Sequence, residues 1–303
     1  MHLGEVDTSL DVFLPDPDRS VVAVPPPASG PGHWAGAPSA ACENGQIYLA
    51  YRLRHPLGQG RGYAIAVARS DDGDTFETIL TLGKDEFDTD SLERPALVRT
   101  PEGTWRLYVS CATQGTKHWR VEMIEADHPG EFDAHSSRVV LPGDAKTAVK
   151  DPVIRYRDST WQLWASCHPL ADPGETDQMV TDYASSPDGI DWTWHGTALS
   201  GRPGYWDARG ARVTSVCFVD GKIVASYDGR PTAAENYEEL TGFATGTEPA
   251  GLTAYGDMPA AASPFRSAGL RYLDILPLPG GQFRLYYEMT RADGAHELRT
   301  ELR

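Results

Sequence analysis

Trp105-Arg106-Leu107-Tyr108-Val109 is one of five similar five-residue segments that recur along this chain of 303 residues. Each segment has apolar residues at its first, third and fifth positions, the alternation typical of a strand that buries one face. A turn that contains glycine, aspartate, asparagine or proline precedes each one. These repeat segments start at Ile47, Trp105, Trp161, Ile223 and Phe283, at spacings of 58, 56, 62 and 60 residues.

Units of this length and strand content predict an all-β fold, a five-bladed β-propeller with four antiparallel strands per blade. We expect a single domain over residues 1–303, in which residues 1–32 form an extended arm rich in proline near its end. A β-sandwich with coincidental spacing is the alternative. The expected blades span residues 33–85, 86–142, 143–200, 201–260 and 261–303.

The composition is acidic, with 27 Lys+Arg against 43 Asp+Glu and a formal net charge of −16. Such a surface repels phosphates and anionic lipids, which argues against a general nucleic-acid or membrane-surface binder. The first twenty residues lack a basic start and an apolar core, so we expect no secretory signal and a cytoplasmic location. The four cysteines form no C-x-x-C pair and are expected to be buried reduced thiols. The sequence leaves the oligomeric state open.

The segment Lys150-Asp151-Pro152-Val153-Ile154 precedes the third repeat segment, and X-Pro steps recur at 37–38, 94–95 and 151–152. With the five repeats, this Asp-Pro step resembles the five-bladed propeller glycoside hydrolases, namely family 43 arabinanases and xylosidases, family 32 invertase-like enzymes and family 130 mannoside phosphorylases. The resemblance covers roughly residues 30 to 303. It implies that the first strand of each blade lines a central funnel and that Asp151 lies among the catalytic carboxylates.

Two positions depart from the family 43 pattern. Ala37 stands where the resemblance implies an Asp general base, and Ala211 stands where it implies a Glu general acid. Glycoside hydrolysis normally uses two carboxyl groups on either side of the scissile bond. We therefore expect an altered acid/base set in which Asp151 acts with Asp207 or Glu93, and the retaining or inverting course stays open.

Basic and aromatic residues near the expected first strands are candidates for substrate binding. Guanidinium and ammonium groups bind a carboxylate, phosphate or sulfate, although the same residues would also form ion pairs between blades. Trp34 and Trp206 are candidate sugar platforms, and His168 is a rim residue that would equally serve a structural role. The basic candidates are Arg94, Lys150, Arg209, Arg212 and Arg271.

The sequence predicts a carbohydrate-active enzyme, a glycosidase or phosphorylase, that acts on a small glycoside or sugar-like metabolite, anionic ligands included. We recognise no phosphate-binding loop, dinucleotide fingerprint or metal-ligand cluster, so no cofactor is expected, while a metal ion is left open. Two alternatives remain at this level. One is a ligand-binding propeller without catalysis, and the other is a biosynthetic enzyme with a non-glycosidic reaction.

Overall fold

The structure is a computed structural model that describes residues 10–265 and 269–303. Twenty β-strands and five short 3₁₀ turns make up its regular structure, so the described chain is all-β as predicted. No helix in the described part of the chain is long and apolar enough to cross a membrane. Residues 1–9 of the expected N-terminal arm lie outside the described residues. The rest of that arm carries the 3₁₀ turn η1 (Asp11–Phe13) and the strand β1 (Val21–Val24).

Three antiparallel sheets of four strands form the middle of the chain. The first contains β6 (Leu92–Arg99), β7 (Trp105–Ala112), β8 (Trp119–Ala126) and β9 (Arg138–Leu141). The second contains β10 (Thr147–Arg157), β11 (Thr160–Pro169), β12 (Val180–Ser186) and β13 (Thr193–Leu199). The third contains β14 (Ala211–Val219), β15 (Lys222–Gly229), β16 (Leu240–Gly246) and β17 (Thr253–Tyr255).

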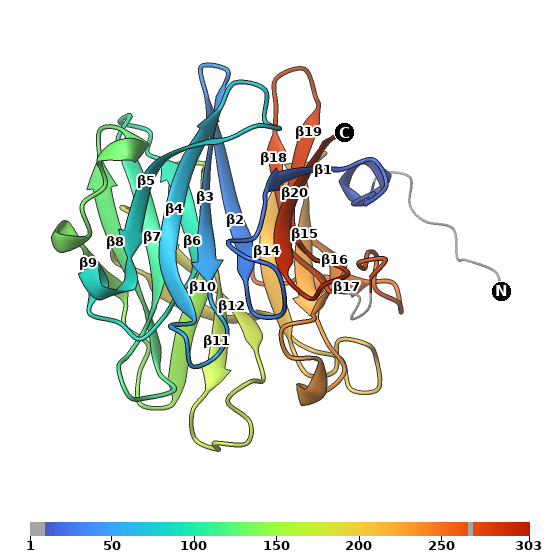
Figure 1. The fold of residues 1–303 in the computed structure, drawn as a ribbon. Coiled ribbons are helices and arrows are strands. Elements are labelled where there is room, and N and C mark those ends of the chain that lie inside the picture. Colours follow the sequence, from blue (N-terminus) through green and yellow to red (C-terminus); the bar gives the residue numbers. More distant parts are fainter. Residues whose placement is uncertain (1–9, 266–268) are drawn as a thin grey trace.

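The two ends of the chain meet in one eight-stranded sheet, and Figure 1 shows the first unit in blue beside the last unit in red. A parallel bridge between Trp34 and His296 joins the two units, and β1 pairs with β20. The first unit contains β2 (Trp34–Glu43), β3 (Gln46–Arg54), β4 (Gly62–Ser70) and β5 (Glu77–Gly83). The last unit contains β18 (Leu270–Pro277), β19 (Phe283–Thr290) and β20 (His296–Leu302).

The four remaining 3₁₀ turns lie in connections between strands. They are η2 (Lys84–Phe87), η3 (Pro129–Glu131), η4 (Ala134–Ser136) and η5 (Ala233–Glu235).

The repeat segments form the second strand of every unit, namely β3, β7, β11, β15 and β19. The third residue of each segment is fully buried, because alternate side chains of these strands pack against a neighbouring unit. Five apolar clusters lie between successive units, and the fifth joins Leu49 of the first unit to Leu276 and Tyr286 of the last. A two-sheet sandwich would instead share one core.

Every first strand carries an irregularity in its pairing with the second strand. At three of these bulges a non-glycine residue has a left-handed backbone, with φ of 54° at Ala37 and 53° at Asp151 and Tyr272. A bulge bends the strand and re-aims the neighbouring side chains. The residues just before the bulges are Gly36, Glu93, Lys150 and Arg271, which pair with Arg52, Ser110, Ser166 and Glu288. In the fourth unit Arg212 pairs with Asp228 one residue earlier, and the bulge follows Val213.

Candidate functional site

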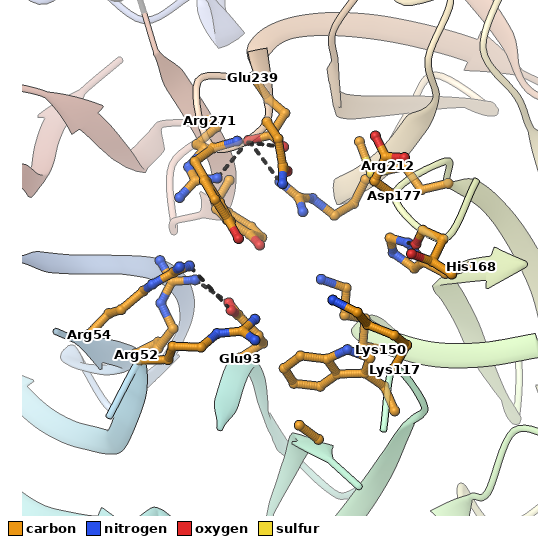
Figure 2. Close-up of a pocket in the computed structure, with 18 of the residues that line it drawn as sticks. Arg52, Arg54, Glu93, Lys117, Lys150, His168, Asp177, Arg212, Glu239 and Arg271 are labelled. Atoms are coloured by element: carbon orange, nitrogen blue, oxygen red, sulfur yellow. Dashed lines mark hydrogen bonds and ion pairs between the residues drawn. The ribbon is translucent and has the colours of Figure 1, made fainter. Parts of the chain in front are cut away.

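Side chains from all five units converge on one central cavity of about 190 Å³. Figure 2 shows its labelled side chains pointing into a common space. The first strands supply Glu93, Lys150, Arg212 and Arg271. The loops between second and third strands supply Arg61, Lys117, Asp177 and Tyr237. From the sequence-predicted set, the structure brings Glu93, Lys150, His168, Arg212 and Arg271 to this cavity.

Two further positions on the second strands supply residues to the lining. The residue that directly follows the five-residue segment does so in the first unit, with Arg52. The residue two positions further on, within one residue of the strand end, does so in the first four units. Sequence reasoning stopped at the fifth residue and missed all of these residues except His168. The missed residues that line the cavity are Arg52, Arg54, Ala112 and Arg230.

Buried ion pairs form a chain along the cavity wall. Arg52 of the first unit binds Glu93 of the second, and its Nη2 lies 2.9 Å from Glu288 Oε2 of the last unit. Arg271 continues the chain, with 2.7 Å to Glu288 Oε1 and 2.6 Å to Glu239 Oε2. Because these pairs join different units, the ion-pair role that the sequence left open for the basic residues is confirmed for Arg271.

Burial by itself would raise the pKa of Glu93 and Glu239, the two buried glutamates of the cavity lining. Arg52, Lys150 and Arg54 outweigh that effect and lower the pKa of Glu93 to about 2. Arg271, Arg212 and Arg230 lower the pKa of Glu239 in the same way. Both groups are therefore ionised at neutral pH.

Asp151 lies fully buried directly behind the cavity lining. Its Oδ2 atom is 3.3 Å from Arg212 Nη1, 3.5 Å from the Tyr272 hydroxyl and 3.7 Å from Lys150 Nζ. Its Oδ1 atom is buried and has no hydrogen-bond partner among the described residues. A buried polar atom without a partner is rare in native structures and calls for an explanation such as a water molecule or a ligand. The backbone N–H of Asp151 donates to Ser110 Oγ at 2.8 Å.

One part of the lining carries cations outside the ion-pair chain. Within residues 10–265 and 269–303, no ion pair is found for Arg61 or Lys117. Lys150 Nζ lies 5.1 Å from the centre of the Trp119 ring, which is a cation–π contact. This contact leaves the ammonium group able to bind a further anion.

His168 lines the cavity but is held by hydrogen bonds. Its Nδ1 atom lies 3.1 Å from the Thr176 carbonyl oxygen, and its Nε2 atom lies 3.1 Å from Ser166 Oγ. Burial and the charge of Lys150 lower its pKa well below the ordinary value, so the ring is neutral. Nδ1–H donates to the carbonyl, and Nε2 then accepts from the serine hydroxyl.

The structure contradicts the expected position of Asp207. This carboxylate is fully buried away from the cavity, where Arg202 Nε donates to it at 2.9 Å and the Tyr227 hydroxyl donates at 2.8 Å. A group held by these two donors does not swing over the cavity mouth. Arg209 does not line the central cavity either, and it pairs with Glu175 and with Asp177 of the lining.

Neither predicted tryptophan offers a free ring face to the cavity. Trp34 is 5% exposed, and its ring stacks on the His296 ring with 4.3 Å between the ring centres. Arg54 Cζ lies 4.1 Å from the centre of the Trp34 ring. Trp206 stacks on Tyr227 at 5.5 Å and packs over Gly242. The Trp34 ring is part of the packing, and the half-buried Trp206 does not line the cavity.

Arg94 lies below the cavity rather than in its lining. It is 2% exposed, and its guanidinium donates to the carbonyl oxygens of Pro38 and Thr214. It thereby connects the first, second and fourth units through backbone acceptors. Its predicted contact with a ligand is not supported by this position.

The first unit lacks a side chain at the position before its bulge, because a carboxylate from the last unit occupies the space. Glu288 Oε2 accepts a hydrogen bond of 3.0 Å from the Ala37 N–H, and a Cβ atom on Gly36 would lie 1.7 Å from it. In the fourth unit Val213, and not Ala211, pairs with Tyr227, the fifth residue of the repeat segment. In the third unit Asp151 follows Lys150 directly, just as Val213 follows Arg212 in the fourth.

The described residues contain no group of three or more His, Cys, Asp and Glu side chains arranged to hold a metal ion. The chemistry that these residues offer is recognition of negative charge by cations, next to carboxylates that stay ionised.

Comparisons with known proteins agree with this architecture. No protein-family model and no curated protein matches the sequence. A thermostable family-43 glycoside hydrolase superposes with a TM-score of 0.69 at 14% identity, covering 93% of this chain and 91% of its own. The GH43_1 enzyme from Xanthomonas citri complexed with xylotriose gives 0.65 at 14% identity, covering 93% and 90%.

A third solved structure extends the likeness to a second family. This structure comes from work on the GH130 family of mannoside phosphorylases, which contains glycoside hydrolases that target β-1,2 mannosidic linkages in Candida mannan. It superposes with a TM-score of 0.64 at 14% identity, covering 97% of this chain and 92% of its own. At these identities the likeness establishes the shared fold.

Proposed function

We propose that this chain is a divergent carbohydrate-active enzyme of the propeller glycoside hydrolase type, either a glycosidase or a phosphorylase. The observation that carries the proposal is the central cavity, in which Glu93 and the neighbours of Asp151 meet on a fold shared with such enzymes. The ligand is a small glycoside or a sugar-like metabolite, bound where the first strands converge.

The proposal includes closure of the five units into a single five-bladed propeller over residues 1–303. The apolar cluster that contains Leu49 and Leu276 and the bridge between Trp34 and His296 support this closure, because they join the first unit to the last. Closure places the bulges of all five first strands around one axis. The cavity would then be the mouth of that axis.

The charge of the lining supports an anionic ligand. Eight Lys and Arg residues border the cavity against four Asp and Glu residues, and Arg61 and Lys117 lie outside the ion-pair chain. A carboxylate, phosphate or sulfate on the ligand would neutralise this excess, and a planar guanidinium binds such groups through two parallel hydrogen bonds. A uronic acid, a sugar phosphate and a sulfated sugar share this chemistry.

In this proposal the ionised Glu93 and the neighbouring Asp151 side chain stabilise the positive charge that develops at the anomeric carbon when the glycosidic bond breaks. Lys150 and Arg212 hold Asp151 in place from one side, and its unpartnered Oδ1 atom is left for a water molecule or the ligand.

The test is turnover of a panel of neutral and anionic aryl glycosides, with and without inorganic phosphate, by the wild-type protein and by Asp151→Asn. We expect the variant to lose about 10²- to 10⁴-fold in kcat/KM, the range for a group that acts in the transition state. Asp158→Asn makes the same chemical change in an exposed turn and should keep full activity. Full turnover by Asp151→Asn would refute the role given to Asp151.

A second candidate is a ligand-binding protein without catalysis. The observation in its favour is the low pKa of the wall carboxyl groups Glu93 and Glu239, which leaves neither of them protonated to assist a leaving group. Recovery of a bound glycoside intact after long incubation with the wild-type protein would favour this candidate.

A further inference from the structure

Cleavage of a glycosidic bond needs a proton for the leaving oxygen, and the buried ionisable groups of the cavity differ in whether they can supply it. Glu93 and Glu239 are ionised, for the reasons given above. The neutral His168 already donates its ring proton to the Thr176 carbonyl oxygen. Tyr272 is fully enclosed, and burial raises its pKa well above the ordinary value. These four groups are poor proton donors.

Tyr237 differs from them in position and backbone conformation. It lines the cavity from the loop between β15 and β16, and it is only partly buried. Its φ of 82° is a left-handed conformation, which is a genuine outlier for a bulky side chain and marks a position that the surrounding structure must hold. Strain of this kind is concentrated at functional sites.

The ion-pair chain holds this strained loop in place. The Tyr237 N–H points to Glu239 Oε1 at 3.4 Å, and Arg230 Nη1 donates to the preceding Asn236 Oδ1 at 2.9 Å. The Tyr237 ring lies 4.5 Å from the Arg54 guanidinium and 5.4 Å from the Trp34 ring. The tyrosine is thus fixed by side chains of the first and fourth units.

We propose that Tyr237 is the proton donor of this site, an inference that rests on the proposed function. Its O–H proton passes to the leaving-group oxygen as the C–O bond to the anomeric carbon breaks and its electron pair stays on that oxygen. Water, or phosphate in a phosphorolytic reaction, forms the new bond to the anomeric carbon. With either nucleophile, the proton that the attacking oxygen loses is released to solvent and one returns from solvent to the phenolate, so the enzyme is restored.

The electrostatic surroundings support this role. Burial by itself would raise the pKa of Tyr237, but the guanidiniums of Arg54 and Arg61 outweigh burial and lower it below its ordinary value. These same cations stabilise the phenolate that remains after proton transfer. Arg54 is packed against the Trp34 and Tyr237 rings and therefore stays close to the tyrosine.

The first experiment compares aryl glycosides whose leaving groups differ in basicity. Tyr237→Phe should lower kcat/KM by about 10²- to 10⁴-fold for a 4-methoxyphenyl glycoside, whose basic leaving oxygen needs a proton. The same variant should remain within about tenfold of wild type for a 2,4-dinitrophenyl glycoside, whose leaving oxygen does not. Tyr156→Phe removes a hydroxyl from a 43% exposed tyrosine and serves as the control. An equal loss on both substrates would overturn the proposal.

The second experiment needs no substrate. Near-ultraviolet absorbance follows tyrosine ionisation with pH, and the wild-type protein should contain a tyrosine that ionises below pH 10 and is missing in Tyr237→Phe. Identical titration curves would overturn the proposal. If no glycoside is cleaved, the proposed function fails and the proton-donor role fails with it. If glycosides are cleaved and Tyr237→Phe matches wild type on every one, the inference alone fails.

Discussion

The Tyr272 hydroxyl lies 3.5 Å from Asp151 Oδ2, although the two residues are 121 positions apart in the sequence. The contact connects the third and last units behind the cavity. The Arg212 guanidinium lies at the same place, 3.9 Å from the centre of the Tyr272 ring and 3.3 Å from Asp151 Oδ2. The Arg212 guanidinium therefore contacts an aromatic ring of the last unit and a carboxyl group of the third unit.

Arg212→Met should destabilise the protein by about 3–5 kcal/mol, because it removes the cation that the buried side chains of Asp151 and Asp228 share. Urea denaturation at neutral pH measures the change. Arg69→Met is the matched control, since Arg69 and its partner Glu77 are 46% and 68% exposed and such pairs contribute about 1 kcal/mol or less. Equal losses for the two variants would contradict the stabilising role of the buried network.

The stability of the protein should depend on pH below 4.5. The pKa of Glu93 lies at about 2 in the folded protein, against an ordinary value of 4.5, so the unfolded chain binds more protons in this window. Its contribution is present above pH 4.5 and is lost as the pH falls toward 2, by up to about 3 kcal/mol. The free energy of unfolding should therefore fall as the solution is acidified.

Glu93→Gln should make this acid-induced fall shallower, because the variant has no carboxyl group to protonate at this position. Some dependence should remain, since the pKa of Glu239 is lowered in the same direction. Thermal unfolding measured from pH 2 to pH 5 provides the comparison, with the exposed Glu77→Gln as control. A wild-type slope in Glu93→Gln would show that another group dominates.

Lys117→Gln should weaken binding of an anionic ligand by about five- to tenfold and leave a neutral sugar unaffected, because one partly screened cation is removed. Calorimetry with glucuronate, inorganic phosphate and xylose, repeated at high salt, measures the effect. Lys222→Gln, on an exposed strand end away from the cavity lining, should bind all three as wild type does. Unchanged phosphate and glucuronate affinities in Lys117→Gln would remove support for an anionic ligand.

Much of the fold could be predicted because its signal is local. The apolar alternation that starts at Trp105 and recurs about every sixty residues marks the second strand of each unit, and burial of alternate side chains follows from strand geometry alone. The bulges at Asp151 and Ala37 also had a local signal, the recurring X-Pro step. Reading three residues past each repeat segment would have found Arg52 and Arg230 as well.

The partners of the charged residues had no such signal. Asp207 and Glu93 are both carboxylates near a predicted first strand, yet one is held by Arg202 and Tyr227 away from the cavity and the other lines it. Trp34 stands directly at a predicted inner strand, and its ring is covered by His296. The local sequence shows where a charged or aromatic residue stands in the chain, but it does not show which side chains from other units contact it.

The sequence by itself determined the repeated strands, the all-β class and part of the charged lining, namely Glu93, Lys150, Arg212 and Arg271, because each depends on spacing within one unit. Only the tertiary structure decided which charges pair with one another, that Glu288 fills the space at Gly36, and that Tyr237 stands beside Arg54. These contacts join different units, and their distances depend on how the sheets pack, which no spacing along the chain specifies.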